Sequence, residues 1–451
     1  MPTTAAPPWL RHYDAAVPQH LDYPSVPLYT LLDDSAARQP SHACTNFFGK
    51  RMSYAAVKEA SDRLAAGLQE LGVQPGDRVA LLLPNSPQFV IAYYAILKAG
   101  AVVAPLNPVQ PGGELARQLS DCGAQTAITI PLFLEKVTAL LGQTPLQRVI
   151  YTPVADYLPV PMNLGSRLQE RGQMRAVDRR SVIHLAGLLE APLPAGWQPA
   201  PVDLHNLAVL IYSGGATGVA KGIMLSHSAL VASAWQLRAW FGLDATMSAL
   251  TVMPLFHGLG MGAAMNAPLL AGGEIITLPR FQAENVLKAI QEWKPAFFIA
   301  VPAMIDAFNS VPTLEKYNLR SIQGIFVGAA PLTQAVKTGF ERRSGARLIE
   351  GYGLAEAVTA IMANPYGGQH KVGSIGLPFP DVEMKIVTLD GTADLGPNET
   401  GEIVLRSPTL MLGYTNQPAA AAEAIKDGCT LATWATWTPM ATSPSSTASR
   451  S

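Results

Sequence analysis

Residues 213–222, with the sequence SGGATGVAKG, combine glycines, hydroxyls and one lysine within ten positions. Glycine lets a backbone turn tightly and direct several N–H groups toward one anion. Ser213 and Thr217 add hydroxyl donors, and Lys221 adds a positive charge. This combination predicts a loop that binds phosphate groups.

Two other interpretations of this segment use the same residues. A plain glycine-rich hairpin fits as well, because the apolar run IMLSH follows immediately. A Walker A loop, and with it a P-loop NTPase, is disfavoured: that motif has glycine where Ala220 precedes Lys221, and Ser or Thr where Gly222 follows.

Hydrophobic periodicity around the loop predicts alternating helices and strands. The expected helices are 53–71, 87–99, 114–122, 228–241 and 285–292. The expected strands are 78–83, 101–105, 124–130, 207–212, 249–253, 274–278, 296–300, 324–327 and 347–350. This alternation favours an α/β fold with parallel sheets covered by helices, because βαβ units connect parallel strands.

Changes in composition and in hydrophobic pattern divide the chain into four expected units. Residues 1–25 are proline-rich and should wrap over the surface, and 26–366 carry the α/β pattern. Residues 367–428 contain VEMKIV and GEIVLR, which predict a small antiparallel β unit. Residues 429–451 form a Ser/Thr-rich tail whose one charged side chain is that of Arg450.

Composition excludes several classes of function. Lys and Arg total 32 against 33 Asp and Glu, a balance that argues against broad binding to nucleic acid. Three scattered cysteines are too few for a disulfide framework or a zinc site and suggest a reducing cytoplasm. No secretory signal or membrane span is expected, although peripheral membrane contact stays open. Nothing in the sequence fixes the oligomeric state.

The glycine-rich segment and IMLSH together resemble the phosphate loop of the AMP-forming acyl-CoA synthetases of the adenylate-forming superfamily. The usual form there is close to TSGTTGxPKG, whereas Gly214, Ala216 and Ala220 stand here for Ser, Thr and Pro. Further segments match in the family's order, over about residues 25–428: RVALLLPNSPQFVIAYYAILKAGAVVAPLNP, MPLFHGLG, VGAAPL, GYGLAEA, GSIGLP and GEIVLRSPTLMLGY. The resemblance implies two doubly wound α/β subdomains plus a small β-barrel-like unit.

The resemblance also implies roles for particular residues. Catalytic roles fall to Thr217, Lys221 and Glu356, and Glu356 would hold Mg²⁺ because a hard cation prefers oxygen ligands. The implied nucleotide-binding residues are Ser213, Gly214, Gly215, Thr217, Gly218, Lys221, Gly328, Ala329, Ala330, Gly351, Tyr352, Gly353 and Ala355. The implied acyl-binding residues are His257, Gly258 and Gly260.

Each of these roles has a plainer structural alternative. Tyr352, whose ring would stack on adenine, could be a core aromatic residue. Glu356 could be a solvated surface acid, and His257 a core histidine with satisfied hydrogen bonds. Ala355 stands where the family usually has Thr, so one hydroxyl contact to the ligand should be missing.

The implied reaction is ATP-dependent activation of a medium- or long-chain fatty acid through acyl-AMP to acyl-CoA. Its small molecules are the fatty acid, ATP, Mg²⁺ and CoA. Two alternatives remain open at this point. One is an acyl-AMP ligase that delivers to a carrier protein, and the other is a nucleotide- or acyl-binding module without turnover.

The tail suggests a shifted reading frame near Gly428. One permitted set of codons for 429–451, read from its third base, gives HTGDLGDMDADGYFTIIDRLKE. This string contains a TGD and a DRLK like the family's ribose-binding segment and hinge. The family's C-terminal domain, with a lysine that assists adenylation, would then be lost, and turnover should be impaired.

Overall fold

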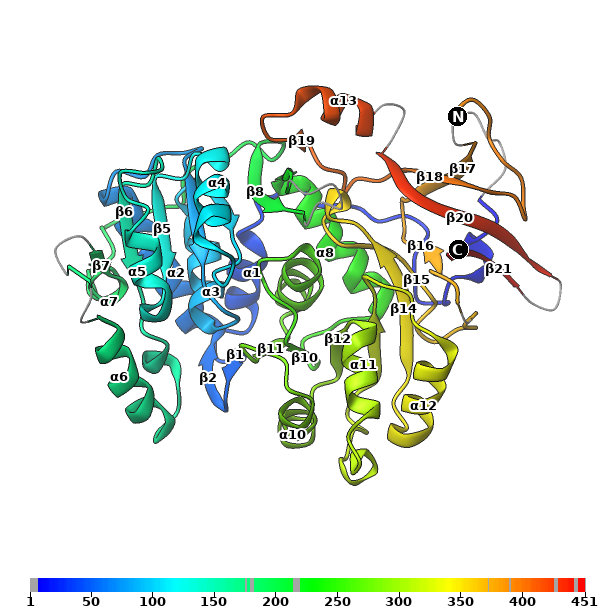
Figure 1. Ribbon diagram of the computed structural model, residues 1–451, viewed down its shortest axis with the longest axis horizontal. Coiled ribbons are helices and arrows are strands. Elements are labelled where there is room, and N and C mark those ends of the chain that lie inside the picture. Colours follow the sequence, from blue (N-terminus) through cyan, green and yellow to red (C-terminus); the bar gives the residue numbers. More distant parts are fainter. Residues whose placement is uncertain are drawn as a thin grey trace.

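The computed structural model describes residues 7–174, 177–178, 182–213, 220–371, 373–388 and 391–425, and the backbone alone of 429–441 and 445–450. The described strands form two large sheets and one small antiparallel sheet (Figure 1). No helix in these ranges is long and apolar enough to cross a membrane.

Eight of the described strands form the first sheet. In spatial order they are β19 (Gly413–Tyr414), β9 (Gly222–Ser226), β8 (Leu207–Tyr212), β4 (Val102–Pro105), β3 (Arg78–Leu82), β5 (Thr126–Thr129), β6 (Arg148–Tyr151) and β7 (Val182–His184). From β8 to β7 the pairing is parallel, whereas β9 pairs antiparallel with β8, and β19 antiparallel with β9.

Helices cover both faces of this sheet. They are α1 (Thr30–Arg38), α2 (Tyr54–Glu70), α3 (Pro87–Lys98), α4 (Gly112–Cys122), α5 (Pro131–Thr138), α6 (Met162–Gln173) and α7 (Leu185–Glu190), with the short 3-10 turn η2 (Val154–Tyr157). A further 3-10 turn, η1 (Leu10–His12), belongs to the N-terminal segment. The Ser53 hydroxyl caps α2 by accepting from the Ala56 N–H at 3.2 Å. Pro87 begins α3, where its missing N–H leaves no bond unmade.

Nine of the described strands form the second sheet. In order they are β16 (Leu377–Pro378), β15 (Ala360–Ala363), β14 (Leu348–Gly353), β13 (Gly324–Val327), β12 (Phe297–Ala300), β10 (Ser248–Thr251), β11 (Glu274–Thr277), β1 (Ala43–Phe47) and β2 (Lys50–Ser53). The segments that accompany them are α8 (His227–Phe241), the π-helical η5 (Leu259–Asn266), α9 (Ala267–Ala271), α10 (Ala283–Trp293), α11 (Pro302–Asn309), η6 (Leu314–Lys316), α12 (Gln334–Ser344) and η7 (Ala355–Ala357).

Alternation along the strands shows why these sheets are buried on both faces. In β3, Val79 and Leu81 belong to the large core between the two sheets, which α3 and α8 help to fill. Ala80 and Leu82, between them in sequence, face a second core against α4 and α5. A third core lies on the outer face of the second sheet, under α10 to α12. Strands covered on both faces are continuous apolar runs, so the sequence predicted them well.

The expected helices and strands are confirmed, with small differences at their ends. The edges of the sheets differ from a purely parallel arrangement. Strand β2 pairs antiparallel with β1, and β15 and β16 add two antiparallel strands at the far edge. The pair β1–β2 was not predicted, because β1 finds its other partner in β11, more than 200 residues away.

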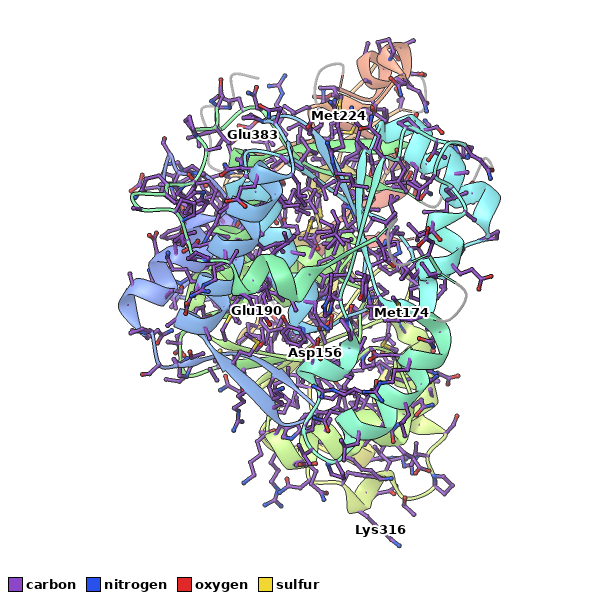
Figure 2. The ribbon with its side chains drawn as sticks, turned by 90° about the vertical axis from the view of Figure 1, so that its left-hand side faces the viewer. Asp156, Met174, Glu190, Met224, Lys316 and Glu383 are labelled. Carbon is purple, nitrogen blue, oxygen red and sulfur yellow. The ribbon has the colours of Figure 1, made fainter. Side chains whose placement is uncertain are left out.

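The small sheet comprises β17 (Glu383–Val387), β18 (Thr400–Arg406), β20 (Cys429–Ala441) and β21 (Ser445–Arg450). The antiparallel pairing of β17 with β18 agrees with the strands expected from VEMKIV and GEIVLR. Strands β16 and β19, which lie within the same expected unit of residues 367–428, pair instead with the second and the first sheet, so the bounds of that unit stay a prediction. Helix α13 (Pro418–Ile425) follows β19, and Figure 2 shows it above Met224 of β9.

The N-terminal segment lies against the region around β16 and β17. The Tyr13 hydroxyl donates to the Pro378 carbonyl at 2.6 Å. The carboxylate of Asp381 accepts from the Leu21 N–H at 3.0 Å and from the Tyr23 hydroxyl at 2.8 Å. These bonds tie the start of the described chain to residues some 360 positions later.

Candidate functional site

The glycine-rich segment connects two antiparallel strands. Strand β8 enters it and β9 leaves it, and the Ser213 N–H donates to the Lys221 carbonyl at 3.1 Å across the neck. Gly214, Gly215, Thr217 and Gly218 lie outside the described residues. A hairpin is therefore present, and phosphate binding by its tip stays a prediction.

Three side chains from distant parts of the sequence meet beside this neck. The ammonium nitrogen of Lys221 lies over the ring of Tyr414, 4.9 Å from its centroid. The Tyr414 hydroxyl donates to Oε1 of Glu356 at 2.8 Å. Lys221 and Glu356 are both half-buried, and neither lies within 4 Å of an opposite charge in the described part of the chain. The two predicted charged residues are thus brought together through Tyr414.

Backbone pairing fixes this arrangement. Strand β19 aligns Tyr414 with Ile223 and Gly413 with Met224 of β9. The Met411 N–H donates to the Glu356 carbonyl at 2.7 Å, which ties the turn η7 to the segment before β19. Both ends of the Lys221–Tyr414–Glu356 group therefore rest on main-chain hydrogen bonds.

A mainly apolar cavity of about 260 Å³ lies next to η7. Its lining includes the predicted residues His257, Gly258, Gly328, Ala329, Gly351, Gly353 and Ala355. Met253, Leu259, Phe326, Leu354, Val358, Thr359 and Ala360 complete the lining. The structure therefore gathers seven of the predicted site residues, from three separate segments of sequence, around one space.

Close backbone contacts explain several of the glycines. A Cβ on Gly258 would lie 2.0 Å from the Val358 carbonyl oxygen, and one on Gly260 would lie 2.2 Å from that of Pro254. Val358 has a φ of +68°, which is rare for a β-branched residue. Gly258 lines the cavity, whereas the face of Gly260 that would carry a side chain is filled by the Pro254 carbonyl.

Tyr352 and Ala330 lie apart from this cavity. Side chains alternate along β14, so Tyr352 faces away from the cavity that Gly351 and Gly353 line. The Tyr352 side chain is 6% exposed and belongs to the large core. Ala330 is exposed, and Ala329 before it has a φ of +67°. Adenine stacking on Tyr352 stays a prediction, and would have to use the opposite side of β14.

A second cavity, of about 230 Å³, lies at the neck of the hairpin. Its polar lining includes Asn107, Gln110, Gln118 and Ser213. His257 lines both this cavity and the apolar one. A ligand with an apolar body and a polar head could therefore pass His257 with one part on each side.

His257 is open to the cavities although many protein atoms surround it. The His257 side chain is exposed where it faces the cavities. The protein atoms around it nevertheless desolvate the imidazole, which lowers its pKa. The ring of Phe256 lies 5.1 Å away, centroid to centroid. A lowered pKa keeps the imidazole neutral near pH 7, so it can donate or accept a hydrogen bond without a fixed charge.

Mg²⁺ fits the carboxylate of Glu356 better than a cage of protein ligands. No group of three His, Cys, Asp or Glu side chains suited to a metal occurs within the described ranges. Oε1 of Glu356 is held by Tyr414, which leaves Oε2 for a cation. Mg²⁺ usually binds one or two carboxylates together with substrate phosphates and water.

Sequence reasoning missed Tyr414 and Thr359. Tyr414 closes a segment that carried the family resemblance, but its partner strand is almost 200 residues earlier. Thr359 lines the apolar cavity with 4% exposure, and its hydroxyl has no hydrogen-bond partner among the described residues. The local sequence marks neither residue. Tyr414 is placed by the pairing of β19 with β9, and Thr359 by the tight turn at Val358.

Comparison with known proteins agrees with this geometry. Residues 32–415 match the model of the family described as AMP-binding enzyme. The chain is 36% identical over 426 residues to a long-chain-fatty-acid–CoA ligase of Bacillus subtilis, covering 93% of this chain and 76% of that protein.

Two solved structures share the fold. One is the anthranilate CoA ligase AuaEII in complex with anthranoyl-AMP, with a TM-score of 0.83, 22% identity, and 95% of this chain and 78% of that chain covered. The other is a long-chain-fatty-acid-CoA ligase (FadD1) from Archaeoglobus fulgidus, with a TM-score of 0.81, 23% identity, and 94% and 84% covered. The two α/β sheets and the small β unit are therefore those of the large domain of this fold. With its family match and its relatives, the chain belongs to the AMP-binding enzyme family, as an AMP-forming acid–thiol ligase.

Proposed function

We propose that this protein activates a medium- or long-chain fatty acid with ATP and transfers the acyl group to CoA. The observation that carries the proposal is the position of His257 between an apolar and a polar cavity. An acyl chain suits the first, and its carboxylate beside the neck of the glycine-rich hairpin suits the second. The printed names of the relatives support a fatty-acid substrate.

The first step joins the carboxylate to the nucleotide. A carboxylate oxygen attacks the α-phosphorus of ATP, the bond from that phosphorus to the bridging oxygen breaks, and pyrophosphate leaves. Lys221 would balance the charge that gathers on the leaving phosphates, together with Ser213 and the loop residues Gly214, Gly215, Thr217 and Gly218. Fixed charges and donors of this kind stabilise a transition state without having to reorganise.

The second step releases AMP. The thiolate of CoA attacks the carbonyl carbon of acyl-AMP, and the bond from that carbon to the phosphate oxygen breaks. The neutral imidazole of His257 can donate a hydrogen bond to the carboxylate before the first step and to the acyl carbonyl oxygen of acyl-AMP in the second, without forming an ion pair with either. Gly258 lines the proposed acyl cavity, and Gly260 lets the Pro254 carbonyl approach the backbone beside it.

Mg²⁺ would be held by Glu356 and would neutralise charge on the phosphates when it is bound. Gly328, Ala329 and Ala355, which line the apolar cavity, would pass close to the nucleotide. Ala330 and Tyr352 lie apart from that cavity, so Tyr352 would stack on adenine only from the opposite side of β14. Ala355 offers no hydroxyl, so the hydroxyl of Thr359, which lines the same apolar cavity, is the nearer candidate for a polar contact to the part of the ligand in that cavity.

Pyrophosphate release with oleate tests this proposal. We expect release to require oleate, ATP and Mg²⁺ together, and oleoyl-CoA to appear when CoA is added. Pyrophosphate release without any CoA thioester would favour a ligase that delivers to a carrier protein. No oleate-dependent release at any CoA concentration would contradict the proposal and favour a binding module.

We also propose that residues 429–451 are read in a shifted frame. The support is their composition, eleven Ser or Thr with Arg450 as the one charged residue, and the family-like string in the alternative frame. The nucleotide sequence from codon 428 onward tests this directly, and a gene without an HTGD-like alternative frame would refute it. Restoring the frame should raise acyl-CoA formation, because that string carries the TGD and DRLK segments of the resemblance.

A further inference from the structure

Tyr414 occupies the space between the two charged residues of the proposed site. It belongs to β19, a two-residue strand at the edge of the first sheet, and its side chain is 9% exposed. Its ring faces the ammonium group of Lys221, and its hydroxyl donates to the carboxylate of Glu356. One side chain therefore contacts both charges that the proposed chemistry uses.

This placement keeps the two charges separate. A lysine and a glutamate in direct contact would neutralise each other and would have to part before binding phosphates or a cation. The Tyr414 ring gives the ammonium a favourable electrostatic neighbour that does not cancel its charge. The hydroxyl uses one oxygen of Glu356 and fixes the direction of the other.

The backbone makes this position rigid. The Leu412 N–H donates to the Met224 carbonyl, and the Thr415 N–H to the Gly222 carbonyl, both at 2.8 Å. A Cβ on Gly222 would lie 2.4 Å from Cγ2 of Thr415, so the two strands approach unusually closely here. Main-chain hydrogen bonds thus hold Tyr414 on both sides in the sequence, opposite Ile223, which is two residues after Lys221.

We propose that Tyr414 is a positioning residue that orients Glu356 toward the divalent cation and holds Lys221 toward the phosphates. This inference rests on the proposed function and deepens it. The hydroxyl acts on the cation side through Glu356, and the ring acts on the phosphate side through Lys221. The two halves of the side chain can therefore be tested separately.

The experiment measures ATP binding by calorimetry, with and without Mg²⁺, in wild type and in Tyr414→Phe. Removing the hydroxyl should weaken binding in the presence of Mg²⁺ by about tenfold, the size expected for a hydrogen bond to a charged group. Binding without Mg²⁺ should change less than about twofold. Tyr414→Leu should also weaken binding without Mg²⁺, because the ring that holds Lys221 is lost.

Tyr23→Phe is the matched control. Tyr23 also donates to a carboxylate, that of Asp381 at 2.8 Å, but on the N-terminal segment. Its loss should leave the Mg²⁺ dependence of ATP binding unchanged. Equal weakening by Tyr414→Phe with and without Mg²⁺ would overturn the inference, because a merely structural role predicts that result.

A double variant keeps the test decisive if Tyr414→Leu does not fold. Glu356→Gln should remove the effect of Mg²⁺, and adding Tyr414→Phe to it should cause no further loss. Full additivity of the two changes would overturn the inference. A wild-type chain that binds no ATP would overturn the proposed function and the inference with it, whereas an unchanged Mg²⁺ dependence in Tyr414→Phe would overturn the inference alone.

Discussion

Two lysines in this molecule are held in opposite ways. Lys98, in α3, is fully buried, and its Nζ lies 2.5 Å from Oδ1 of Asp62 and 3.0 Å from the Ser61 hydroxyl. It also lies 2.6 Å from Oδ1 of Asp33, as an ion pair without hydrogen-bond geometry. Lys221 is half-buried and faces an aromatic ring. The charge of Lys98 is balanced by carboxylates within the fold, whereas the charge of Lys221 is available to a ligand.

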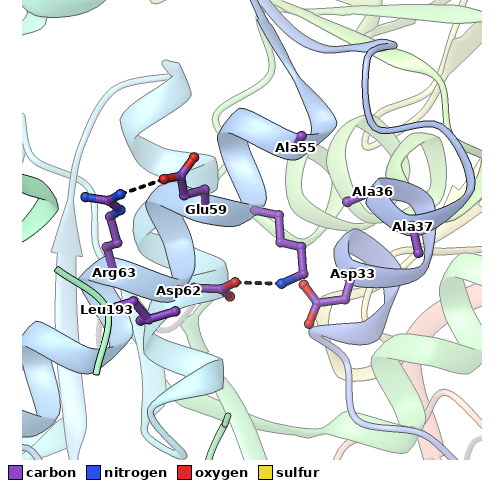
Figure 3. Close-up of a pocket in the computed structure, with 9 residues that line it drawn as sticks. Asp33, Ala36, Ala37, Ala55, Glu59, Asp62, Arg63 and Leu193 are labelled. Atoms are coloured by element: carbon purple, nitrogen blue, oxygen red, sulfur yellow. Dashed lines mark hydrogen bonds and ion pairs between the residues drawn. The ribbon is translucent and has the colours of Figure 1, made fainter. Parts of the chain in front are cut away.

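The cavities beside the two lysines sharpen this contrast. The cavity next to Asp33 and Asp62, shown in Figure 3, has about 290 Å³, slightly more than the apolar cavity at the proposed site. The acids around it are already paired: Asp62 also binds Lys58 at 2.6 Å, and Glu59 binds Arg63 at 2.7 Å. The volume of a cavity therefore does not identify the ligand site. Charged side chains that are not already paired within the fold, such as Lys221 and Glu356, identify it better.

The largest expected effect is on the stability of the fold, through the cluster of Lys98, Asp33 and Asp62. Lys98→Met should destabilise the fold by about 3–5 kcal/mol, because the half-buried Asp33 loses its counter-charge and the buried Asp62 keeps only Lys58. Chemical denaturation measures the loss. A change below about 1 kcal/mol would mean that water or Lys58 replaces Lys98, and the contrast between the two lysines would then be lost.

His227 is a buried base without a counter-charge, so it should destabilise the fold when it becomes protonated. His227, which begins α8, accepts a hydrogen bond at Nδ1 from the Leu28 N–H at 3.2 Å, and burial lowers its pKa to about 4. Its unfolded pKa is near 6.5, so the unfolded chain takes up the proton first as the pH falls. Stability is complete above pH 6.5 and should fall by about 3 kcal/mol as the pH approaches 4. His227→Gln should flatten this part of a stability–pH curve, and an unchanged slope would refute the assignment.

Replacing Lys221 should affect ligand binding and leave the stability of the fold largely unchanged. Lys221→Ala is expected to weaken ATP binding about ten- to hundred-fold, since a hydrogen bond to a charged group contributes about 1.5–3 kcal/mol. AMP, which lacks the β- and γ-phosphates, should lose much less. Calorimetry with both nucleotides decides, and an equal loss for the two would place Lys221 away from the terminal phosphates.

The smallest effect is expected for an exposed pair. His20 is hydrogen-bonded to Asp381, which raises the pKa of the imidazole, and its side chain is 75% exposed. A raised pKa means that the pair stabilises the fold fully below pH 6.5 and loses this effect as the pH rises through the higher value. His20→Gln should thus lower the melting temperature slightly at pH 5.5 and leave it unchanged at pH 9. A loss of equal size at both pH values would contradict the pairing.

Much of the fold could be predicted because buried strands carry their own signal. The run RVALLL predicted β3, and the helix after Pro87 was found within one residue of its end. Strands whose partners lie far away gave no such signal. Strand β1 pairs with β11, and β19 with β9, and neither pairing leaves a local trace in the sequence.

The same reason limits prediction of the site. Seven of the residues around the apolar cavity could be named from motifs, and the structure brings these seven together, whereas Thr359 could not be named. The role of Tyr414 could not be, because it depends on the register between two short edge strands. The direction of Tyr352 depends on the alternation along β14, which a motif does not report.

A structure determined with ATP and Mg²⁺ bound tests the central claim most directly. We predict density for the triphosphate beside Nζ of Lys221 and for a cation at Glu356, with none in the cavity beside Asp33 and Asp62. Nucleotide density in that second cavity, or at the proposed site without contact to either Lys221 or Glu356, would contradict the account.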